Sequence, residues 1–257
     1  MYSVADLHQY YQSDEGVKTA QHLAKDIAAL WSPAADEMAA AVGFPFPFLA
    51  NRHLPPVLMP NMPGAACWQG PDGVISAQID SACWPISSDQ LDRLFIAHAL
   101  EFVPDHRQFL QEAARCLCGS GRLLLMVPHR RGMWARSTRT PFGHGTSFSR
   151  GQLNRLLLDC GLEPTAYHRS LISLPTRLDW PAQIKASMGR LGGRVARVFG
   201  GVLLVEAQKM VYVKKPASAK QQVRSIIKLQ GKPALSQRQS RAAAASYLSD
   251  MPAFDEG

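Results

Sequence analysis

The sequence lacks several features that mark whole classes of protein. No apolar run approaches the roughly 20 residues that a membrane-spanning helix requires. The first residues, MYSVADLHQYYQSDEG, have neither the basic nor the apolar segment of a secretory signal peptide, so we expect a cytoplasmic protein. Cysteine is scarce as well. The chain has five cysteines in spacings that fit no zinc site, and we expect reduced, mostly buried thiols and no metal.

Acidic side chains are few in the second half of the chain. Residues 1–114 carry 5 basic and 13 acidic side chains, a net charge of −8, whereas residues 115–257 carry 23 basic and 7 acidic side chains, a net charge of +16. Aromatic residues also become rare after Lys214, where Lys, Gln, Ser and Ala dominate. We therefore expect a folded domain over residues 1–213 and a basic, mostly disordered tail over residues 214–257.

Two interpretations of this basic half remain open. In the first, it binds an anionic partner, such as a phospholipid, a nucleic acid or an acidic protein, and the tail is the first candidate for that contact. Nucleic acid is the least favoured of these partners, because phosphate contacts alone carry no sequence specificity. In the second interpretation, it is a solvated basic face without a partner.

The sequence does contain an alternation of helical and strand patterns. Residues 17–31 place apolar side chains at helical spacing, behind Ser13 as a candidate cap. A second helix is predicted over residues 105–118, where Gly119 and Gly121 are expected to terminate it. A third follows Ser149, and a basic helical insertion is predicted later in the chain, over residues 178–197.

Short apolar segments between these helices predict a seven-stranded sheet. The expected strands cover residues 38–42, 54–60, 73–80, 91–98, 122–128, 162–174 and 198–213. Strands that alternate with helices favour an α/β fold with a doubly wound, mostly parallel sheet. The last two strands follow each other without a crossover helix of the usual kind, so we expect them to form an antiparallel pair at one edge.

Polar side chains follow the predicted strand at residues 91–98. His98 and Glu101 come at its end, in the segment LFIAHALEF. Because ligands of parallel α/β sheets bind at the carboxyl ends of the strands, this pair is a candidate binding site. The alternative is that the two side chains cap the end of the strand and pair with arginines.

Residues 91–128 are similar to the second half of class I S-adenosylmethionine (SAM)-dependent methyltransferases of the type 11 kind. The similarity lies in a hydrophobic strand with an early acid, a His-x-Leu-Glu-x-Val turn, a helix end with Arg, Leu and two Gly, and a strand closing on Val-Pro. The matching residues are Asp92, His98, Leu100, Glu101, Val103, Arg115, Leu117, Gly119 and Gly121. The resemblance implies a Rossmann-like methyltransferase fold, SAM as cofactor, and His98 and Glu101 as cofactor contacts.

An element just upstream resembles the same family. Asp80, followed by Trp84 and Pro85, is similar to an Asp-x-x-x-Leu-Pro element whose acid accepts a hydrogen bond from the adenine amino group. A carboxylate suits this role because it only accepts hydrogen bonds, whereas the exocyclic amine donates them. The resemblance therefore assigns Asp80 and Trp84 to the cofactor site. A surface aspartate in a loop is the alternative.

The glycine-rich turn of the family is missing. After the first strand the family has a Gly-x-Gly-x-Gly turn that lets the backbone approach the cofactor, but this chain has VGFPFPFLA and keeps only Gly43. Phe44 or Phe46 would then face the cofactor's methionyl or adenine part. The ribose-binding acid is missing after the second strand as well. Asn61 is the nearest polar substitute, and its amide makes weaker, uncharged hydrogen bonds.

The segment at residues 129–148 combines arginines with aromatic residues. It follows the fifth strand, where the methyl acceptor is expected, and Arg side chains there would grip the carboxylate or phosphate of an acidic acceptor. His144 and His129 are candidate general bases, because the pKa of histidine lies near neutrality. A lid with solvated arginines is the alternative. The WAR and TPFGHG elements of residues 129–148, together with GFPFPFL after the first strand, are similar to a little-characterised bacterial branch of the methyltransferases.

Two functions follow from these residues. The first is a SAM-dependent methyltransferase that acts on a small or acidic acceptor. The second is a catalytically inactive protein of the same fold that acts as a binding or regulatory adaptor through its basic half. A third, nucleic-acid modification, is disfavoured because the chain lacks the Asn/Asp-Pro-Pro-aromatic element of amino-group methyltransferases.

Overall fold

The computed structural model describes residues 2–49, 55–62, 64–65, 76–171 and 200–210. The chain divides into two units, Met1–Val211 and Tyr212–Gly257. The second unit lies outside the described residues, and so do the predicted tail at 214–257 and the predicted helical insertion at 178–197. The fold described below is therefore that of the first unit.

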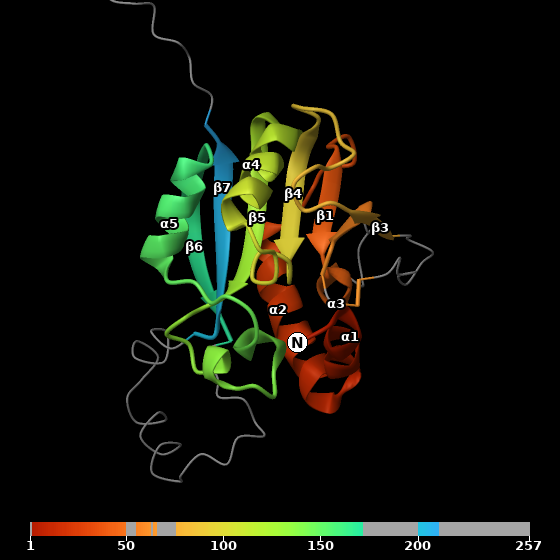
Figure 1. Cartoon of the computed structure of the whole chain (residues 1–257), viewed down its shortest axis with the longest axis vertical. Helices are drawn as coiled ribbons and strands as arrows, with labels where there is room; N and C mark the ends of the chain where they lie inside the picture. Colours follow the sequence, from red (N-terminus) through yellow and green to blue (C-terminus); the bar gives the residue numbers. More distant parts are fainter. Residues whose placement is uncertain (1, 50–54, 63, 66–75, 172–199, 211–257) are drawn as a thin grey trace, which may run out of the picture. The chain divides into compact units, whose positions relative to one another are not determined.

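A seven-stranded sheet forms the centre of this unit, with the strand order β3-β2-β1-β4-β5-β7-β6 (Figure 1). Its strands are β1 (Ala39–Gly43), β2 (Val57–Pro60), β3 (Ser76–Ile79), β4 (Leu91–Ala97), β5 (Leu117–Pro128), β6 (Leu162–Ser170) and β7 (Val202–Lys209). Neighbouring strands from β3 to β5 are parallel, and β7 is antiparallel to both β5 and β6. The predicted mixed sheet is confirmed, with its antiparallel strand lying one place in from the edge.

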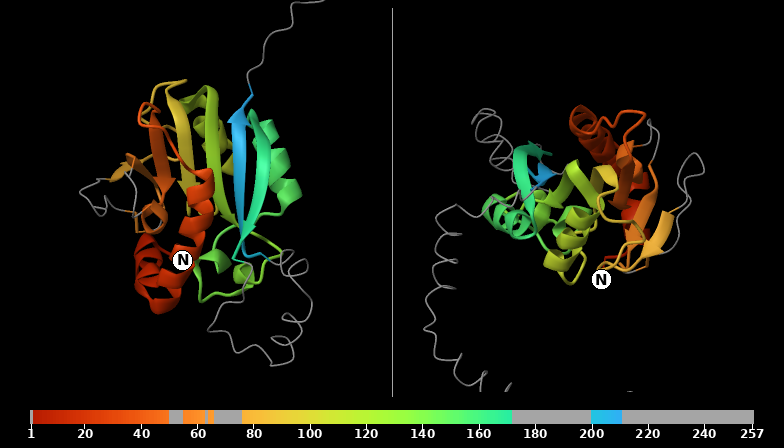
Figure 2. Two further views of the ribbon diagram at one scale, coloured as in Figure 1. Left: turned by 180° about the vertical axis from the view of Figure 1, so that it is seen from behind. Right: turned by 90° about the horizontal axis from the view of Figure 1, so that it is seen from above.

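Helices cover both faces of the sheet (Figures 1 and 2). One face carries α1 (Val4–Gln12) and α2 (Asp14–Leu30), and the other carries α4 (His106–Cys116) and α5 (Arg150–Asp159). Successive residues of β4 serve opposite faces, as the strand period of two requires: Ile96 belongs to the apolar cluster under α4 and α5, whereas Phe95 belongs to the cluster under α1 and α2. The sheet is therefore doubly wound, as expected.

Two N-terminal helices replace the one that was predicted. Ser13 caps α2 as expected, because its hydroxyl accepts a hydrogen bond from the Gly16 N–H. The preceding helix α1 was missed. It begins with a capping box in which Ser3 and Asp6 each accept from the other's backbone N–H, and this box is the sequence signal that marks its start.

The predicted termination of α4 by two glycines is wrong. This helix ends at Cys116, and β5 begins at the next residue, with Gly119 and Gly121 inside the strand. The pairing of β4 with β5 shifts register between Leu91 and Arg93, and a Cβ on Gly121 would lie 2.7 Å from the carbonyl oxygen of Leu91. Gly121 therefore allows close backbone approach at an irregularity in the sheet rather than ending a helix.

The end of β1 meets the end of β4 at Gly43. This residue has a φ of +91°, and a Cβ there would lie 2.2 Å from the carbonyl oxygen of Ala97. The following N–H, of Phe44, donates a 2.7 Å hydrogen bond to that same carbonyl. The chain then forms the short helix α3 (Phe46–Leu49). Glycine is required here both by the backbone conformation and by the contact with β4.

We predict that Gly43→Ala lowers the free energy of unfolding by about 2 kcal/mol or more, because the methyl group strains the backbone and displaces Ala97. Urea denaturation followed by circular dichroism measures the change. Gly151→Ala is the matched control. Gly151 lies in α5 with no atom within 4 Å of the added methyl group, so this variant should be neutral or slightly stabilising. Equal losses in both variants would contradict the account.

Candidate functional site

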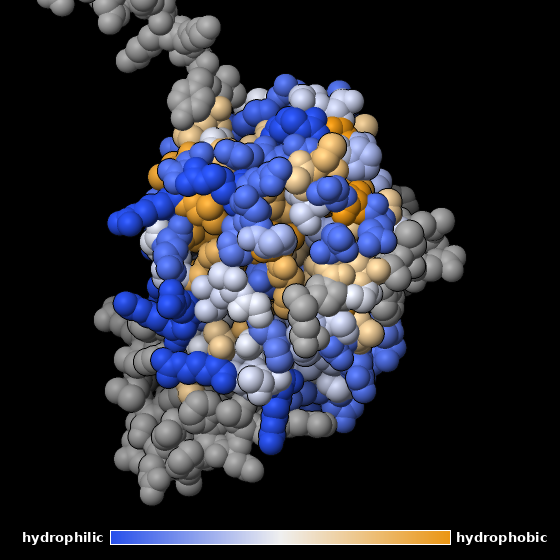
Figure 3. Space-filling view, in the orientation of Figure 1, coloured by the Kyte–Doolittle hydropathy of each residue, from blue (hydrophilic) through white to orange (hydrophobic). Residues whose placement is uncertain are grey.

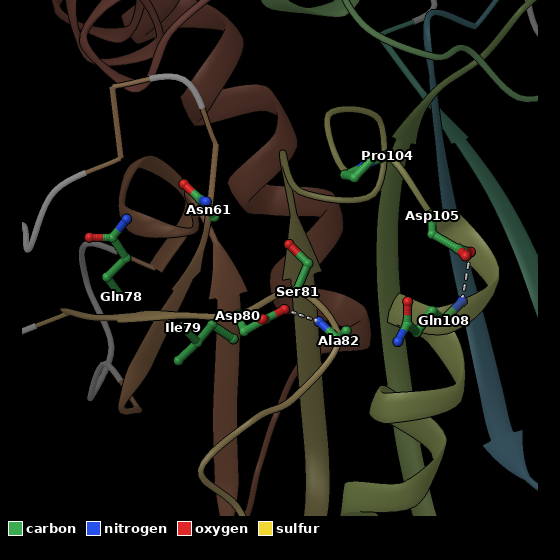
Figure 4. A pocket seen from close by; sticks show the side chains of 9 residues that line it. All are labelled: Asn61, Gln78, Ile79, Asp80, Ser81, Ala82, Pro104, Asp105 and Gln108. Atoms are coloured by element: carbon green, nitrogen blue, oxygen red, sulfur yellow. Dashed lines mark hydrogen bonds between the residues drawn. The ribbon is translucent and has the colours of Figure 1, made fainter.

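A pocket of about 490 Å³ opens at the carboxyl ends of β2, β3 and β4 (Figure 4). Asn61 follows β2 and Asp80 follows β3, and in the figure both lie across the pocket from Asp105 at the start of α4. The described residues that line the pocket are Asn61, Gln78, Ile79, Asp80, Ser81, Ala82, Pro104, Asp105 and Gln108. Asn61 and Asp80, two of the residues that the sequence assigned to the cofactor, are therefore brought together in this pocket. The sequence analysis did not identify the other residues of the lining.

Carboxylates lie on both sides of this pocket. Oδ1 of Asp80 accepts a 2.8 Å hydrogen bond from the Ala82 N–H, which turns the chain just after β3. Asp105 is the N-cap of α4, and its Oδ1 accepts from the Gln108 N–H at 2.9 Å. No described residue of the lining is basic. The pocket therefore suits a neutral or cationic ligand that donates hydrogen bonds.

Trp84 positions the rim of the pocket instead of lining it. Its side chain is buried, and its ring packs edge-on against Phe109 with 5.3 Å between centroids. The backbone N–H of Trp84 donates to Glu112 at 2.8 Å, and Arg115 donates to the carbonyl oxygens of Trp84 and Ile86 at 3.3 and 2.7 Å. The Arg115 guanidinium also lowers the pKa of Glu112. This pair on α4 thus clamps the segment that continues from Asp80.

His98 and Glu101 form a buried hydrogen-bonded chain with Tyr11 of α1. Nε2 of His98 lies 2.7 Å from the Tyr11 hydroxyl, and its Nδ1 lies 3.0 Å from Oε1 of Glu101. All three side chains are buried, and none of them lines the pocket. The predicted pairing of His98 with Glu101 at the end of β4 is therefore present, but its third member could not be found from local sequence, because Tyr11 lies 87 residues away.

For an ionised Glu101 and a neutral His98 imidazole, the hydrogen-bond chain of Tyr11, His98 and Glu101 has one order of protons. Burial raises the pKa of Tyr11 well above 10, so the phenol keeps its proton. The Glu101 carboxylate only accepts hydrogen bonds, so Nδ1 of His98 carries a proton and donates it. Nε2 of the neutral imidazole then accepts from the Tyr11 hydroxyl. This nitrogen is therefore a proton acceptor aimed at a hydroxyl group.

Two buried polar atoms have no hydrogen-bond partner among the described residues: Oε2 of Glu101, which belongs to the hydrogen-bonded group of Tyr11, His98 and Glu101, and Nε2 of His106. Burial lowers the pKa of His106, while the negative charges of Asp105 and Glu101 act in the opposite direction. Buried polar atoms are nearly always hydrogen-bonded, so an unpaired carboxylate oxygen marks a place where a ligand or water is expected.

Phe44 and Phe46 lie in the apolar cluster and not in the pocket. Both are buried, and their ring centroids are 5.4 Å apart. Phe44 also stacks on Tyr11 at 6.3 Å, and Phe48 meets the same ring edge-on at 5.4 Å. The segment that stands in place of a glycine-rich turn therefore builds an aromatic wall beside His98.

The two predicted general bases lie elsewhere. Nε2 of His144 donates a 2.7 Å hydrogen bond to the Thr138 carbonyl, and the His144 ring stacks on Tyr2 with 4.1 Å between centroids. His129 donates from Nδ1 to the Gly200 carbonyl at 2.9 Å, and burial lowers its pKa. Neither side chain lines the pocket. Their assignment as bases remains a prediction.

The segment between β5 and α5 is tied to the end of β4. It contains two short 3₁₀ helices, η2 (Trp134–Arg136) and η3 (Pro141–Gly143). The N–H of Thr146 donates to the Glu101 carbonyl at 2.8 Å, and Phe142 lies 5.3 Å from the His98 ring. The segment thus adds Phe142 to the aromatic rings around His98.

Among the described residues, no group of three or more His, Cys, Asp or Glu side chains is arranged to hold a metal ion. The part of the chain described here also contains no helix of the length and apolar character needed to cross a membrane.

A family model described as "Methyltransferase domain" matches residues 64–125. No curated protein matches the chain. Among solved structures, a SAM-dependent methyltransferase from Thermotoga maritima aligns with a TM-score of 0.57 at 12% identity, covering 80% of this chain and 95% of its own. A geranyl diphosphate C-methyltransferase from Streptomyces coelicolor aligns with a TM-score of 0.53 at 16% identity, covering 77% of this chain and 87% of its own.

A third structure, a SAM-dependent methyltransferase from Mesorhizobium loti, aligns over its whole length and 74% of this chain, with a TM-score of 0.50 at 16% identity. At such identities these structures show a shared fold. Together with the matched segment, they confirm the predicted resemblance to class I SAM-dependent methyltransferases. The same findings support a methyltransferase enzyme.

We predict that Arg115→Met loosens the segment after Asp80, because the side chain no longer holds the carbonyls of Trp84 and Ile86. Amide hydrogen exchange in peptides covering residues 81–90 should become about tenfold faster. Arg107→Met is the matched control, since Arg107 is also on α4 but pairs with Asp159 on the exposed surface. Unchanged exchange in Arg115→Met would show that the clamp has no role.

Proposed function

We propose that this chain is a SAM-dependent methyltransferase that binds the adenosine part of SAM in the pocket lined by Asn61 and Asp80, and methylates a small acceptor. The observation that carries the proposal is the position of these two side chains, which follow adjacent parallel strands and line one pocket at their carboxyl ends. This is the edge of the sheet at which α/β folds bind ligands.

The chemistry of the lining suits adenosine. The Asp80 carboxylate accepts hydrogen bonds, as the adenine amino group requires, and Oδ2 is available beside the Oδ1 that accepts from Ala82. The Asn61 amide both donates and accepts, so it suits a ribose hydroxyl. The described residues of this lining include no basic side chain, which favours a nucleoside over a ligand with phosphates. The adenosine half of SAM therefore fits the residues present.

When bound, SAM supplies a methyl group activated on a sulfonium sulfur, and the protein's part is to align the acceptor and remove its proton. The reacting end would lie toward the junction of β1 and β4. Gly43, Phe44 and Phe46, which were predicted as cofactor contacts, keep that role in this proposal. His98 and Glu101, the other two predicted contacts, face Tyr11 and each other instead. Trp84 enters it only as support for the rim of the pocket.

Positive charge on the acceptor side supports an acidic acceptor. Residues 129–158 contain no Asp or Glu, and Arg130, Arg131, Arg136 and Arg150 are exposed. Figure 3 shows strongly hydrophilic side chains along the α5 side of the molecule. Arginine grips carboxylates and phosphates through paired hydrogen bonds, so an anionic group on the acceptor would be held by this segment.

The non-catalytic adaptor stays the second candidate, because buried phenylalanines stand where the family has glycines. The two candidates differ in one measurement. A methyltransferase should bind S-adenosylhomocysteine (SAH) in calorimetry with the full chain. An adaptor that has lost its cofactor site should show no heat of binding at millimolar SAH.

We predict that Asp80→Asn weakens SAH binding by about 10- to 100-fold, because the amide presents one acceptor oxygen without charge in place of a carboxylate. Isothermal titration calorimetry measures the loss. Asp36→Asn is the matched control, since Asp36 is exposed and precedes β1 at the opposite edge of the sheet, and SAH affinity should be unchanged. Equal affinity in the wild type and Asp80→Asn would remove Asp80 from the site.

A further inference from the structure

We propose that the group of the acceptor that is methylated is a phenol hydroxyl, and that the Tyr11 ring stands in the place of that phenol. The Tyr11 hydroxyl lies where the hydroxyl of the acceptor binds, on Nε2 of His98 with Glu101 behind it. This inference rests on the proposed methyltransferase function and adds to it the acceptor class, the acceptor site and the proton-accepting atom.

The backbone of His98 is held in an unusual conformation. Its φ is +50°, in the left-handed region, directly after β4. Such conformations cost free energy and persist where the surrounding structure fixes them, and they are common at functional sites. Here the conformation aims an entirely buried imidazole at a hydroxyl 2.7 Å away, between the carboxyl ends of the central strands.

The hydrogen-bond chain has the arrangement of a general base with its orienting carboxylate. Nδ1–H of His98 donates to Glu101, which fixes the tautomer and leaves Nε2 to accept a proton from the hydroxyl that faces it. The second oxygen of Glu101 is buried and has no partner among the described residues, so the described residues offer no other donor that competes with His98 for this carboxylate. Such a carboxylate stabilises the imidazolium that forms when Nε2 takes a proton.

The surroundings select for a ring that carries the hydroxyl. Tyr11 stacks on Phe44, meets Phe48 edge-on, and lies 5.7 Å from the His98 ring. Phe142 lies 5.3 Å from the same His98 ring. Aromatic pairs in these geometries add stability beyond the area they bury. A free phenol of the size of the tyrosine side chain would make the same contacts once α1 moves away.

The step is balanced with SAM as the methyl donor. The acceptor oxygen forms a bond to the methyl carbon while the carbon–sulfur bond breaks, and its electron pair stays on sulfur to give SAH. The acceptor's proton moves to Nε2 of His98, and the imidazolium paired with Glu101 later releases it to water. Tyr11 is a positioning residue that closes the site before the acceptor arrives.

The test replaces Tyr11 by a cavity and offers 4-methylphenol, which is the tyrosine side chain as a free molecule. In calorimetry, Tyr11→Ala should bind 4-methylphenol at least about tenfold more tightly than toluene, because only the phenol has a hydroxyl for His98. The preference should vanish in Tyr11→Ala combined with His98→Phe. Tyr10→Ala is the matched control. Tyr10 is the neighbouring α1 phenol, pairs with Thr19 and should create no such preference.

Product analysis adds a second readout. With SAM present, Tyr11→Ala should convert 4-methylphenol to 4-methylanisole, which mass spectrometry detects. The inference would be overturned if Tyr11→Ala bound 4-methylphenol and toluene equally, or bound the phenol without methylating it. If the same variant still bound SAH, the proposed function would stand. If the wild-type protein did not bind SAH, the proposed function itself would be rejected.

A milder variant covers the case in which Tyr11→Ala does not fold. Tyr11→Phe keeps the ring but leaves Nε2 of His98 without its donor, so α1 should yield the site more readily and 4-methylphenol should bind about fivefold more tightly than to the wild type. Tyr10→Phe should leave that affinity unchanged. The same affinity in the wild type and both variants would overturn the inference.

Discussion

The contact between the ends of β1 and β4 governs the arrangement of both candidate sites. At this junction Gly43 leaves no room for a side chain against the Ala97 carbonyl, and Phe44 donates a hydrogen bond to that carbonyl. The contact precedes α3, and it is followed by Phe44, which stacks on Tyr11, and by Phe48, whose ring lies 6.0 Å from that of the buried His98. It also keeps the two central strands in register, so that the pocket on the β2–β3 side and the buried chain on the β5 side lie at one edge of the same sheet.

The two halves of this edge have different physical character. The half after β2 and β3 is a solvent-accessible pocket with carboxylates and amides, which suits a ligand that arrives from water. The half after β1 and β4 is a buried aromatic wall around one hydrogen-bond chain, closed by α1 and by the segment that contains η3. In the inference drawn above, the acceptor enters the second half by displacing Tyr11. The division agrees with a reaction in which cofactor and acceptor enter by separate routes.

Much of the fold could be predicted because burial dominates its sequence pattern. Continuous apolar segments predict β4 and β5, and a stripe of apolar residues at helical spacing predicts α2. The missed helix α1 is short, and its capping box is its clearest signal. The termination of α4 was misjudged because Gly119 and Gly121 serve an irregular strand pairing, which is a tertiary constraint. Nothing in the described structure bears on the predicted tail.

For the site, the resemblance to the methyltransferase family pointed to Asp80, Asn61 and the pair of His98 with Glu101, each of which follows a strand that the sequence predicts. It could not find Tyr11, which meets His98 only through tertiary packing. The most direct test of the central claim is a crystal structure of the full chain grown with SAH. The account predicts the adenine amino group at the Asp80 carboxylate and the ribose beside Asn61. A complex with SAH bound elsewhere, or a pocket that stays empty at saturating SAH, would contradict it.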